Sequence, residues 1–465
     1  MKRPLVWSLL LICLSAILLT GLLLRRLADR QRQSLGVAGA QVLRDVRDRL
    51  AAAAGAVGAP ASAATQATGR PASVDRIAFI DARGRVVTAS PEGGDQRSLT
   101  GQGRRYAFPT WSPDGTSLAA LGASDQDAGV YLMADTVAGK VEAWPAGGAG
   151  DPFYLYWSPE GDRLGYLVGD GDGVGLRVRR RGESAGPALV KDAALYWDWQ
   201  ADGRSLLVHG LDDQGGGRLA WLNLPALGSG QNTDAADLRT FSTDPSGFQA
   251  PAISFGNRYL AYGTQSAPGD SYLTIADRGR YADPVRIPYR GRAAMAWSPR
   301  SETLAFISPP VEAPTFAGSL RVVDLPGGTV RHLANAAVLG FFWSPDGKQI
   351  ACFTVGLPAR DETIQAAFVQ RHPAVSLELW VVDVASGRSR RLLRFVPTRT
   401  FSEQVLPFFD QYARSHRLWS PDSRRLVIAV NDPDAGPGIM VVDARGDEGG
   451  ARRVADGSIA FWSPR

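Results

Sequence analysis

The sequence predicts an all-β chain assembled from short, repeated antiparallel sheets, and three observations carry this prediction. A phrase of Trp-Ser-Pro, then Asp or Glu, then Gly recurs along the chain, and a short apolar stretch follows each copy. The copies lie 42 to 54 residues apart, except for one interval of 76 residues, and this is about the length of one four-stranded sheet with its turns. No segment between the copies has the long amphipathic period of a helix that would connect parallel strands.

The first residue of the phrase is an anchor that marks each repeat. Pro fixes φ at the second turn position, Asp tolerates the third, and Gly accepts the positive φ that closes a tight hairpin. We therefore predict that each anchor ends a strand, that the Asp side chain caps the turn, and that the apolar stretch begins the next strand. The phrase is decayed at Ile253, where it reads Ile-Ser-Phe-Gly-Asn. The anchor tryptophans are Trp111, Trp157, Trp199, Trp297, Trp343, Trp419 and Trp462.

The two ends of the repeat region complement each other. Three strand candidates, 76–80, 85–89 and 96–100, precede the first anchor, whereas the last anchor strand at 459–465 has no strands after it. We predict that these pieces form one composite sheet, which closes a ring and removes an exposed sheet edge. The expected fold is a β-propeller of eight four-stranded blades, or of seven if the segment around Ile253 is a loop.

The repeat resembles a known family. An Ile-Ala-Phe strand, a strand that ends in Asp, an Arg-x-Leu strand and then Trp-Ser-Pro-Asp-Gly are similar to the repeat of TolB-like, WD-type β-propellers, and the similarity covers residues 75–465. The chain departs from the periplasmic TolB protein, which has six repeats and a separate α/β domain. The resemblance implies the fold, but not a role in the Tol–Pal system, because propellers serve unrelated functions.

The first 74 residues form a separate region. After a short tail at 1–3, residues 4–24 carry no charge, and 21 residues are long enough to span the ~30 Å hydrocarbon core of a bilayer as a helix. We expect this segment to be a transmembrane signal anchor, followed by a helical stalk at 25–58 that can weakly self-associate and a flexible linker at 59–74.

The basic character of the chain belongs to this anchor. Residues 1–50 hold nine Lys or Arg and three Asp, a balance of +6, so the remaining residues carry about −1 of the total of +5. Nothing here indicates a nucleic-acid partner. Positive charge on both sides of residues 4–24 leaves the orientation open, and the family resemblance favours a propeller outside the cytoplasm.

Motifs for catalysis or cofactor binding are not found in the sequence. The four histidines are not spaced as zinc ligands, and the chain has no nucleophile elbow, phosphate-binding loop or His-Glu-x-x-His. We therefore expect no catalytic residues, no metal ligands and no cofactor, although whether the chain is an enzyme stays open.

The 76-residue interval between Trp343 and Trp419 holds two insertions and is the candidate functional region. The first, 356–375, contains a helix-like stretch at 361–368. The second, 395–416, is rich in aromatic and charged residues, and such insertions are common docking sites. The alternative is that its aromatic side chains only fill a gap in the fold. The candidate binding residues are Phe401, Glu403, Phe408, Phe409, Asp410, Tyr412, Arg414 and His416.

Three functional hypotheses remain. The leading one is a single-pass bacterial membrane protein whose propeller binds a protein or peptide partner outside the cytoplasm without chemistry of its own. The second is a hydrolase or lyase with a metal in the central channel, and the third is a scaffold or sensor domain that faces the cytoplasm.

Overall fold

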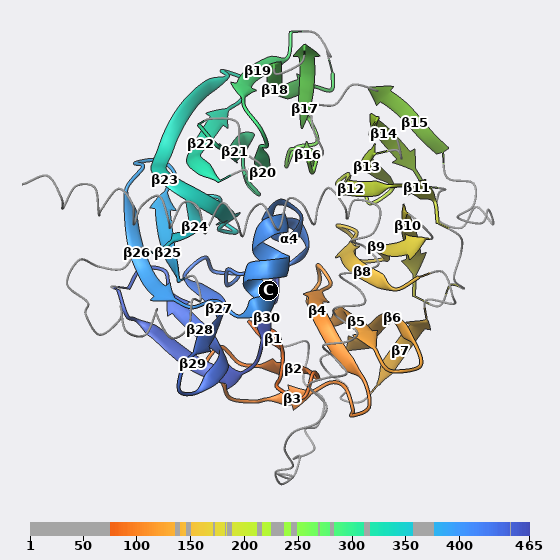
Figure 1. Ribbon diagram of the computed structural model, residues 1–465, viewed down its shortest axis with the longest axis vertical. Helices are drawn as coiled ribbons and strands as arrows, with labels where there is room; N and C mark the ends of the chain where they lie inside the picture. The colour runs from red at the N-terminus through yellow and green to blue at the C-terminus, as the bar shows by residue number, and fades with distance from the viewer. Residues whose placement is uncertain are drawn as a thin grey trace, which may run out of the picture.

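The computed structural model describes residues 75–134, 140–145, 150–170, 173–181, 183, 188–211, 216–224, 237–242, 249–267, 270–279, 283–310, 317–356, 376–446 and 448–465. These residues form antiparallel sheets that resemble propeller blades and surround a common axis (Figure 1). Helix α4 lies near the middle of the ring (Figure 1).

Four sheets contain four strands that are consecutive in the sequence. The first comprises β4 (Arg105–Trp111), β5 (Ser117–Ala123), β6 (Ala128–Ala134) and β7 (Val141–Pro145). The second comprises β8 (Pro152–Trp157), β9 (Arg163–Asp170), β10 (Gly173–Arg180) and β11 (Val190–Asp192). The third comprises β12 (Ala194–Trp199), β13 (Ser205–Leu211), β14 (Gly217–Asn223) and β15 (Asp237–Ser242). The fourth comprises β16 (Ala252–Ile253), β17 (Tyr259–Ala267), β18 (Asp270–Asp277) and β19 (Val285–Tyr289).

The fourth sheet decides the question about Ile253. Its first strand, β16, pairs Ile253 with Leu260 of β17. The decayed repeat is therefore a complete four-stranded sheet, and the alternative that this segment is a loop is wrong.

The next sheet contains seven strands because one long strand belongs to two repeats. The N-terminal part of β23 pairs with β22 up to Val338, and from Val338 onward the strand pairs with β24. Divided at Val338, the sheet is two four-stranded groups. Its strands are β20 (Ala294–Trp297), β21 (Thr303–Ser308), β22 (Gly318–Asp324), β23 (Thr329–Trp343), β24 (Gln349–Val355), β25 (Leu377–Asp383) and β26 (Ser389–Phe395).

The last complete repeat has three full strands and a short innermost one. Trp419 forms an isolated antiparallel bridge with Leu426, at the position of an inner strand. The full strands are β27 (Arg425–Asp432), β28 (Gly436–Asp443) and β29 (Ala451–Asp456).

The remaining sheet joins the two ends of the repeat region, as the sequence predicted. Its strand order is β3-β2-β1-β30, with Ile77 of β1 opposite Trp462 of β30. The backbone N–H of Ser463 also donates to the carbonyl of Arg76 at 2.8 Å. The strands are β1 (Ile77–Ile80), β2 (Val86–Ala89), β3 (Arg97–Ser98) and β30 (Ile459–Trp462).

The anchor tryptophans connect neighbouring repeats. The indole N–H of Trp157 donates to the carbonyl of Thr110, the residue just before the preceding anchor, at 3.2 Å. The same relation recurs at six junctions, because each inner strand offers an unpaired carbonyl to the next repeat. The bonds are Trp111 to Phe461, Trp157 to Thr110, Trp199 to Tyr156, Trp297 to Ala252, Trp343 to Ala296 and Trp419 to Phe342.

The turns after the anchors have the predicted chemistry. Asp114 accepts hydrogen bonds from the Ser112 hydroxyl at 2.5 Å and the Thr116 N–H at 3.0 Å. Burial raises the pKa of Asp114, but these hydrogen bonds outweigh it and the pKa is lowered. Gly115 has φ +71°, the conformation for which glycine is preferred.

Several expectations concern residues outside the described part of the chain. The anchor at 4–24, the stalk at 25–58, the linker at 59–74 and the helix-like stretch at 361–368 all lie there. Among the residues that the structure does describe, no helix has the length and hydrophobicity to cross a membrane.

Candidate functional site

The second insertion occupies the middle of the ring. We call residues 397–417 the plug; they connect β26 to the anchor Trp419. The plug contains a π-helical turn η3 (Phe401–Val405), a 3₁₀ turn η4 (Leu406–Phe408) and helix α4 (Phe409–Ser415). In Figure 1, α4 lies between β20 and β24 on one side and β4 and β8 on the other.

Local contacts fix the start of the plug. Pro397 bridges to Val430 of β27, and the Thr398 hydroxyl donates to the carbonyl of Ser458 at 2.7 Å. Pro407 stands at the beginning of η4, where its missing N–H costs no hydrogen bond. The three short helical turns therefore begin from a segment that the neighbouring strands hold.

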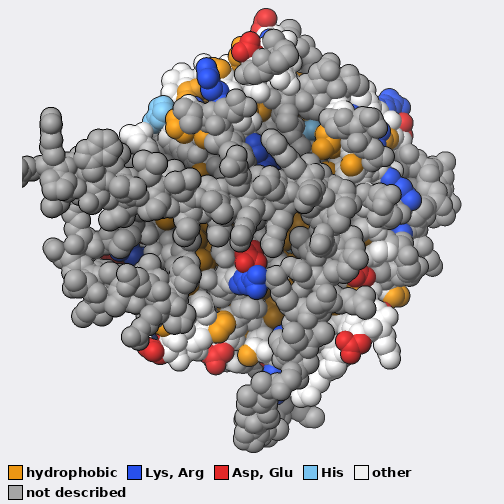
Figure 2. Space-filling view, in the orientation of Figure 1, with side chains coloured by type: hydrophobic (Ala, Val, Ile, Leu, Met, Phe, Trp, Pro, Cys, Tyr) orange, Lys and Arg blue, Asp and Glu red, His pale blue; other side chains and the backbone are white. Residues whose placement is uncertain are grey.

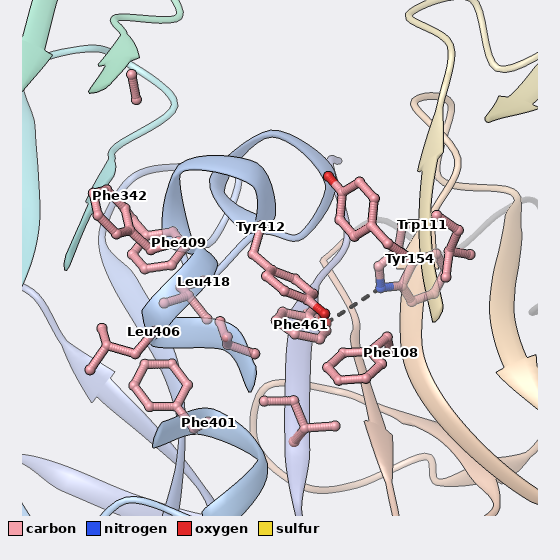
Figure 3. Close-up of a cluster of buried hydrophobic side chains, with 14 of the residues drawn as sticks. Phe108, Trp111, Tyr154, Phe342, Phe401, Leu406, Phe409, Tyr412, Leu418 and Phe461 are labelled. Carbon is pink, nitrogen blue, oxygen red and sulfur yellow. Dashed lines mark hydrogen bonds between the residues drawn. The ribbon is translucent and has the colours of Figure 1, made fainter. Parts of the chain in front are cut away.

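One side of the plug packs on the sheet that contains β23 and β24 (Figure 3). Phe409 and Phe401 are fully buried, with ring centroids 4.9 Å from Phe341 and 5.1 Å from Phe353. Gly340 of β23 makes this approach possible, because a Cβ there would lie 2.7 Å from Leu406 Cδ1. This side of the plug is part of the hydrophobic core.

The opposite side packs on β4 and β8. The Tyr412 ring lies 5.3 Å from that of Phe108 and 5.5 Å from that of Tyr154 (Figure 3). Phe108 stands at a bulge in β4 with φ +50°, a conformation that non-glycine residues rarely adopt. The bulge directs its ring towards the plug, and the Tyr154 hydroxyl donates at 3.1 Å to the Gln411 carbonyl.

His416 is buried at the end of the plug. Its Nδ1 lies 2.6 Å from the Ser415 hydroxyl and its Nε2 lies 3.3 Å from the Phe108 carbonyl. Burial lowers the pKa of His416 to about 3. The Nε2 contact therefore fixes the end of the plug to β4, whereas the Nδ1 contact lies within the plug.

Two buried acidic residues face the plug or belong to it. Asp410 of α4 is 5% exposed and Asp198 of β12 is 6% exposed, and burial raises the pKa of each. Asp198 Oδ2 accepts the N–H of Ile253 at 2.9 Å and forms an ion pair with Arg414 Nη1 at 3.4 Å. Asp198 thus joins two neighbouring repeats and the plug.

The structure brings the predicted residues together but buries most of them. Phe401, Phe409, Asp410, Tyr412 and His416 are buried. Phe408 is half-buried, Arg414 has a side chain 10% exposed, and Glu403 is exposed and paired with Arg399 at 2.8 Å. The packing of the aromatic rings agrees with the alternative that they fill a gap; binding by the exposed residues stays a prediction.

Sequence reasoning missed the residues that receive the plug. These are Phe108, Thr110, Tyr154 and Asp198, which lie on inner strands far from the insertion in sequence. The sequence does distinguish Asp198, because the residue directly before each of the other anchors is uncharged, as in Thr110, Tyr156 and Phe342. A single acidic side chain at this repeat position indicates a special role.

No group of three or more His, Cys, Asp or Glu side chains that could hold a metal ion occurs within the described ranges. The central-channel metal of the second hypothesis was expected to need three or four Asp, Glu, Asn or His side chains from different blades. That hypothesis has no supporting cluster in this part of the chain.

Solved structures with the same kind of ring are similar to this chain. One described as the eukaryotic initiation factor has a TM-score of 0.51 and 12% identity, covering 84% of this chain and 99% of that chain. Its fold is that of the β-propellers. Dihydro-heme d1 dehydrogenase NirN, in complex with DHE, has a TM-score of 0.50 and 14% identity over 84% of this chain and 75% of that chain. TolB from Acinetobacter baumannii has a TM-score of 0.35 and 14% identity over 84% and 67%.

At such identities the similarity concerns the fold alone. No protein-family model and no curated protein matches the sequence.

Proposed function

We propose that the chain is an eight-bladed, TolB-like β-propeller that a helix over residues 4–24 anchors in a membrane. The propeller binds a protein or peptide partner outside the cytoplasm and performs no chemistry of its own. The observation that carries this proposal is the plug, because its helix α4 lies near the middle of a closed ring (Figure 1) and the segment before α4 carries an exposed strip. The strip consists of Arg399, Glu403 and the half-buried Phe408.

The strip combines features of a recognition surface. Arg399 and Glu403 form an exposed ion pair with side chains 62% and 49% exposed, and the half-buried Phe408 follows five residues after Glu403. Basic and acidic side chains also lie side by side near the middle of the face in Figure 2. Because the buried half of the plug holds the strip in one conformation, a partner would lose little of its binding energy to ordering this surface.

The experiment exchanges the charges of the strip without removing its ion pair. In Arg399→Glu with Glu403→Arg, the pair persists with reversed polarity, so the fold is expected to survive. The full chain with this double change is crosslinked in intact cells, and the captured proteins are compared by mass spectrometry. A matched control reverses the exposed pair of Asp237 and Arg239 on β15.

We expect the partner to be lost from the strip variant and retained in the control. Capture of the same proteins at the same yield by both variants would show that the strip is not the binding surface.

The side of the membrane is tested separately. Protease added to spheroplasts is expected to digest the propeller, because the proposal places it outside the cytoplasm. Protection until the membrane is permeabilised would instead favour the scaffold or sensor that faces the cytoplasm.

A further inference from the structure

One buried side chain of the plug has hydrogen-bonding capacity that remains unused. Within the part of the chain that the structure describes, the Nη1 and Nη2 atoms of Arg414 are buried and have no hydrogen-bond acceptor. Nη1 lies 3.4 Å from Asp198 Oδ2, close enough for an ion pair but without hydrogen-bond geometry. Gln411 Nε2, one helical turn before Arg414, is also buried without an acceptor.

Unused donors of this kind are costly. A buried polar group without a partner costs about 1–3 kcal/mol, and an ionised group costs more. Folded proteins therefore supply such groups with a partner from the chain, a water molecule or a ligand. The four unused N–H bonds of the Arg414 terminal nitrogens and those of Gln411 call for oxygen acceptors.

The nearby carboxylates accept backbone N–H groups but not those of Arg414. Asp198 Oδ2 accepts the N–H of Ile253, and Asp410 Oδ1 accepts the N–H of Gln411 at 3.1 Å. Neither acid makes a hydrogen bond to Arg414 within the described residues. Within the described residues these carboxylates therefore do not satisfy the N–H groups of Arg414, which leaves water or a ligand as the acceptor.

Further positive charge lies close to Arg414. Burial raises the pKa of Tyr156, and the charges of Asp198, Arg414 and Arg417 also act on this hydroxyl. Crowding by protein atoms, together with the like charge of Arg300, lowers the pKa of Arg417. Arg414 itself acts on two buried acids, Asp198 and Asp410, and burial raises the pKa of both, which reduces their negative charge. The several unused N–H groups of Arg414 and Gln411 favour a ligand that offers more than one oxygen acceptor.

We propose that Arg414, with Gln411 beside it and Arg417 at the mouth, binds a small oxyanion, a carboxylate or phosphate group, on the axis of the ring. Both oxyanions present paired oxygens that match the planar fork of a guanidinium. Arg417 follows the plug helix by two residues and is exposed to solvent, although protein atoms crowd its guanidinium group. The site is independent of the partner surface proposed above, which lies on the strip of Arg399, Glu403 and Phe408.

The test measures thermal unfolding of the full chain in mild detergent at constant ionic strength. Inorganic phosphate is titrated in one arm and acetate in the other, with chloride as the balancing anion. A bound anion raises Tm with concentration as RT ln(1 + [L]/Kd). We expect such a rise in at least one arm, and the arm that responds tells which oxyanion the site accepts.

Three variants identify the site. Arg414→Met keeps the length of the side chain without its donors, and the dependence of Tm on the anion is expected to disappear. Arg417→Gln leaves the buried part intact and is expected to weaken binding about tenfold, the effect of one charged hydrogen bond. The matched control is Arg399→Gln, which removes an exposed plug arginine and is expected to keep the response.

Two results would overturn the proposal. If Tm of the unmodified chain does not depend on either anion and Arg414→Met unfolds at the same or a higher temperature, the site holds water. If Arg414→Met and Arg399→Gln respond like the unmodified chain, phosphate or acetate binds as an adventitious ion only. Should Arg414→Met fail to fold, an unchanged response in Arg417→Gln would be equally decisive against the site.

Discussion

The ring and the plug are held together in different ways. At six junctions of the ring an anchor indole donates to a backbone carbonyl of the neighbouring repeat, and neither group changes its charge with pH. The plug is held by contacts that occur once, and they include the buried ionisable groups Asp198, Asp410, Arg414 and His416. Six junctions of the ring are therefore alike and redundant, whereas the Trp462 indole donates to Asp75 Oδ1 and the plug depends on single residues.

At the junction of Ile253 with the preceding repeat, the hydrogen bond from an anchor indole to a backbone carbonyl is missing. Ile253 has no indole, and its backbone N–H instead donates to Asp198 Oδ2. The same carboxylate forms the ion pair with Arg414 of the plug. The loss of a tryptophan has thus made one ring junction dependent on the plug, and this is the point where the two regions are coupled.

The largest effect is expected from opening the ring. Deletion of 459–465 removes Ile459, Phe461 and Trp462, each at most 2% exposed, and the carbonyl that Trp111 uses. Burial of each such side chain contributes about 1.5–3 kcal/mol, and the total approaches the whole stability of a typical domain. We expect the deleted chain to lose cooperative thermal unfolding, measured by circular dichroism.

The control for this deletion is removal of Arg465 alone, which is exposed. We expect only a small change in Tm from it. An unchanged Tm after deletion of 459–465 would mean that β30 does not close the ring.

The second largest effect is expected in the pH dependence of stability, because the plug contains a buried histidine whereas the indole bonds of the ring do not titrate. Since the pKa of His416 is about 3 in the fold against an ordinary 6.5, the unfolded chain binds a proton between these values that the folded chain does not. Stability is then fully present above pH 6.5 and falls as the pH decreases towards 3. A difference of this size corresponds to as much as about 5 kcal/mol.

In His416→Gln this loss should largely vanish, as measured by urea unfolding at several pH values. Part of the dependence should remain, because burial also lowers the pKa of His209 to about 4. The exposed His332 provides the control, since His332→Gln should leave the profile unchanged. Equal profiles for the unmodified chain and His416→Gln would contradict the burial of this histidine in the plug.

The ring could be predicted from the sequence because its determinants repeat. The anchor and the turn that contains Asp114 in the first repeat recur with the same residue types in several repeats. The decayed copy at Ile253 also lies within the 42 to 54 residue spacing of the other copies. Closure was predictable because residues 76–100 and 459–465 supply complementary parts of one sheet. A signal that recurs at each repeat survives the loss of one copy.

The position of the plug could not be predicted in this way. The sequence shows an aromatic insertion, but its direction depends on Gly340, on the bulge at Phe108 and on Asp198, all distant in the chain. Each of these features occurs once, and its role can be recognised only when the plug side chain that it contacts is known. The aromatic residues of the insertion were correctly singled out, whereas their burial followed only from the structure.

The coupling between plug and ring is tested by Asp198. Asp198→Ala removes the acceptor of Ile253 and leaves Arg414 without its ion pair, and loss of one partner of a buried pair costs about 3–5 kcal/mol. Asp198→Asn keeps an oxygen for Ile253 and should cost less. Both variants lose the ion pair with Arg414, so the difference between them in chemical unfolding measures the hydrogen bond to Ile253. A loss below about 1 kcal/mol in Asp198→Asn would mean that the ion pair with Arg414 contributes little.

The smallest effect is expected at an ordinary ring junction. Trp343→Phe keeps an aromatic ring but removes the indole N–H that donates to the Ala296 carbonyl at 3.0 Å. One neutral hydrogen bond contributes about 0.5–1.5 kcal/mol, and the smaller ring adds a modest packing loss. Unfolding in urea should therefore show a loss of about 1–2 kcal/mol, well below that of Asp198→Ala. If Trp343→Phe were the more damaging change, the indole junctions would not be redundant, and the contrast between a tolerant ring and a plug that depends on single residues would be reversed.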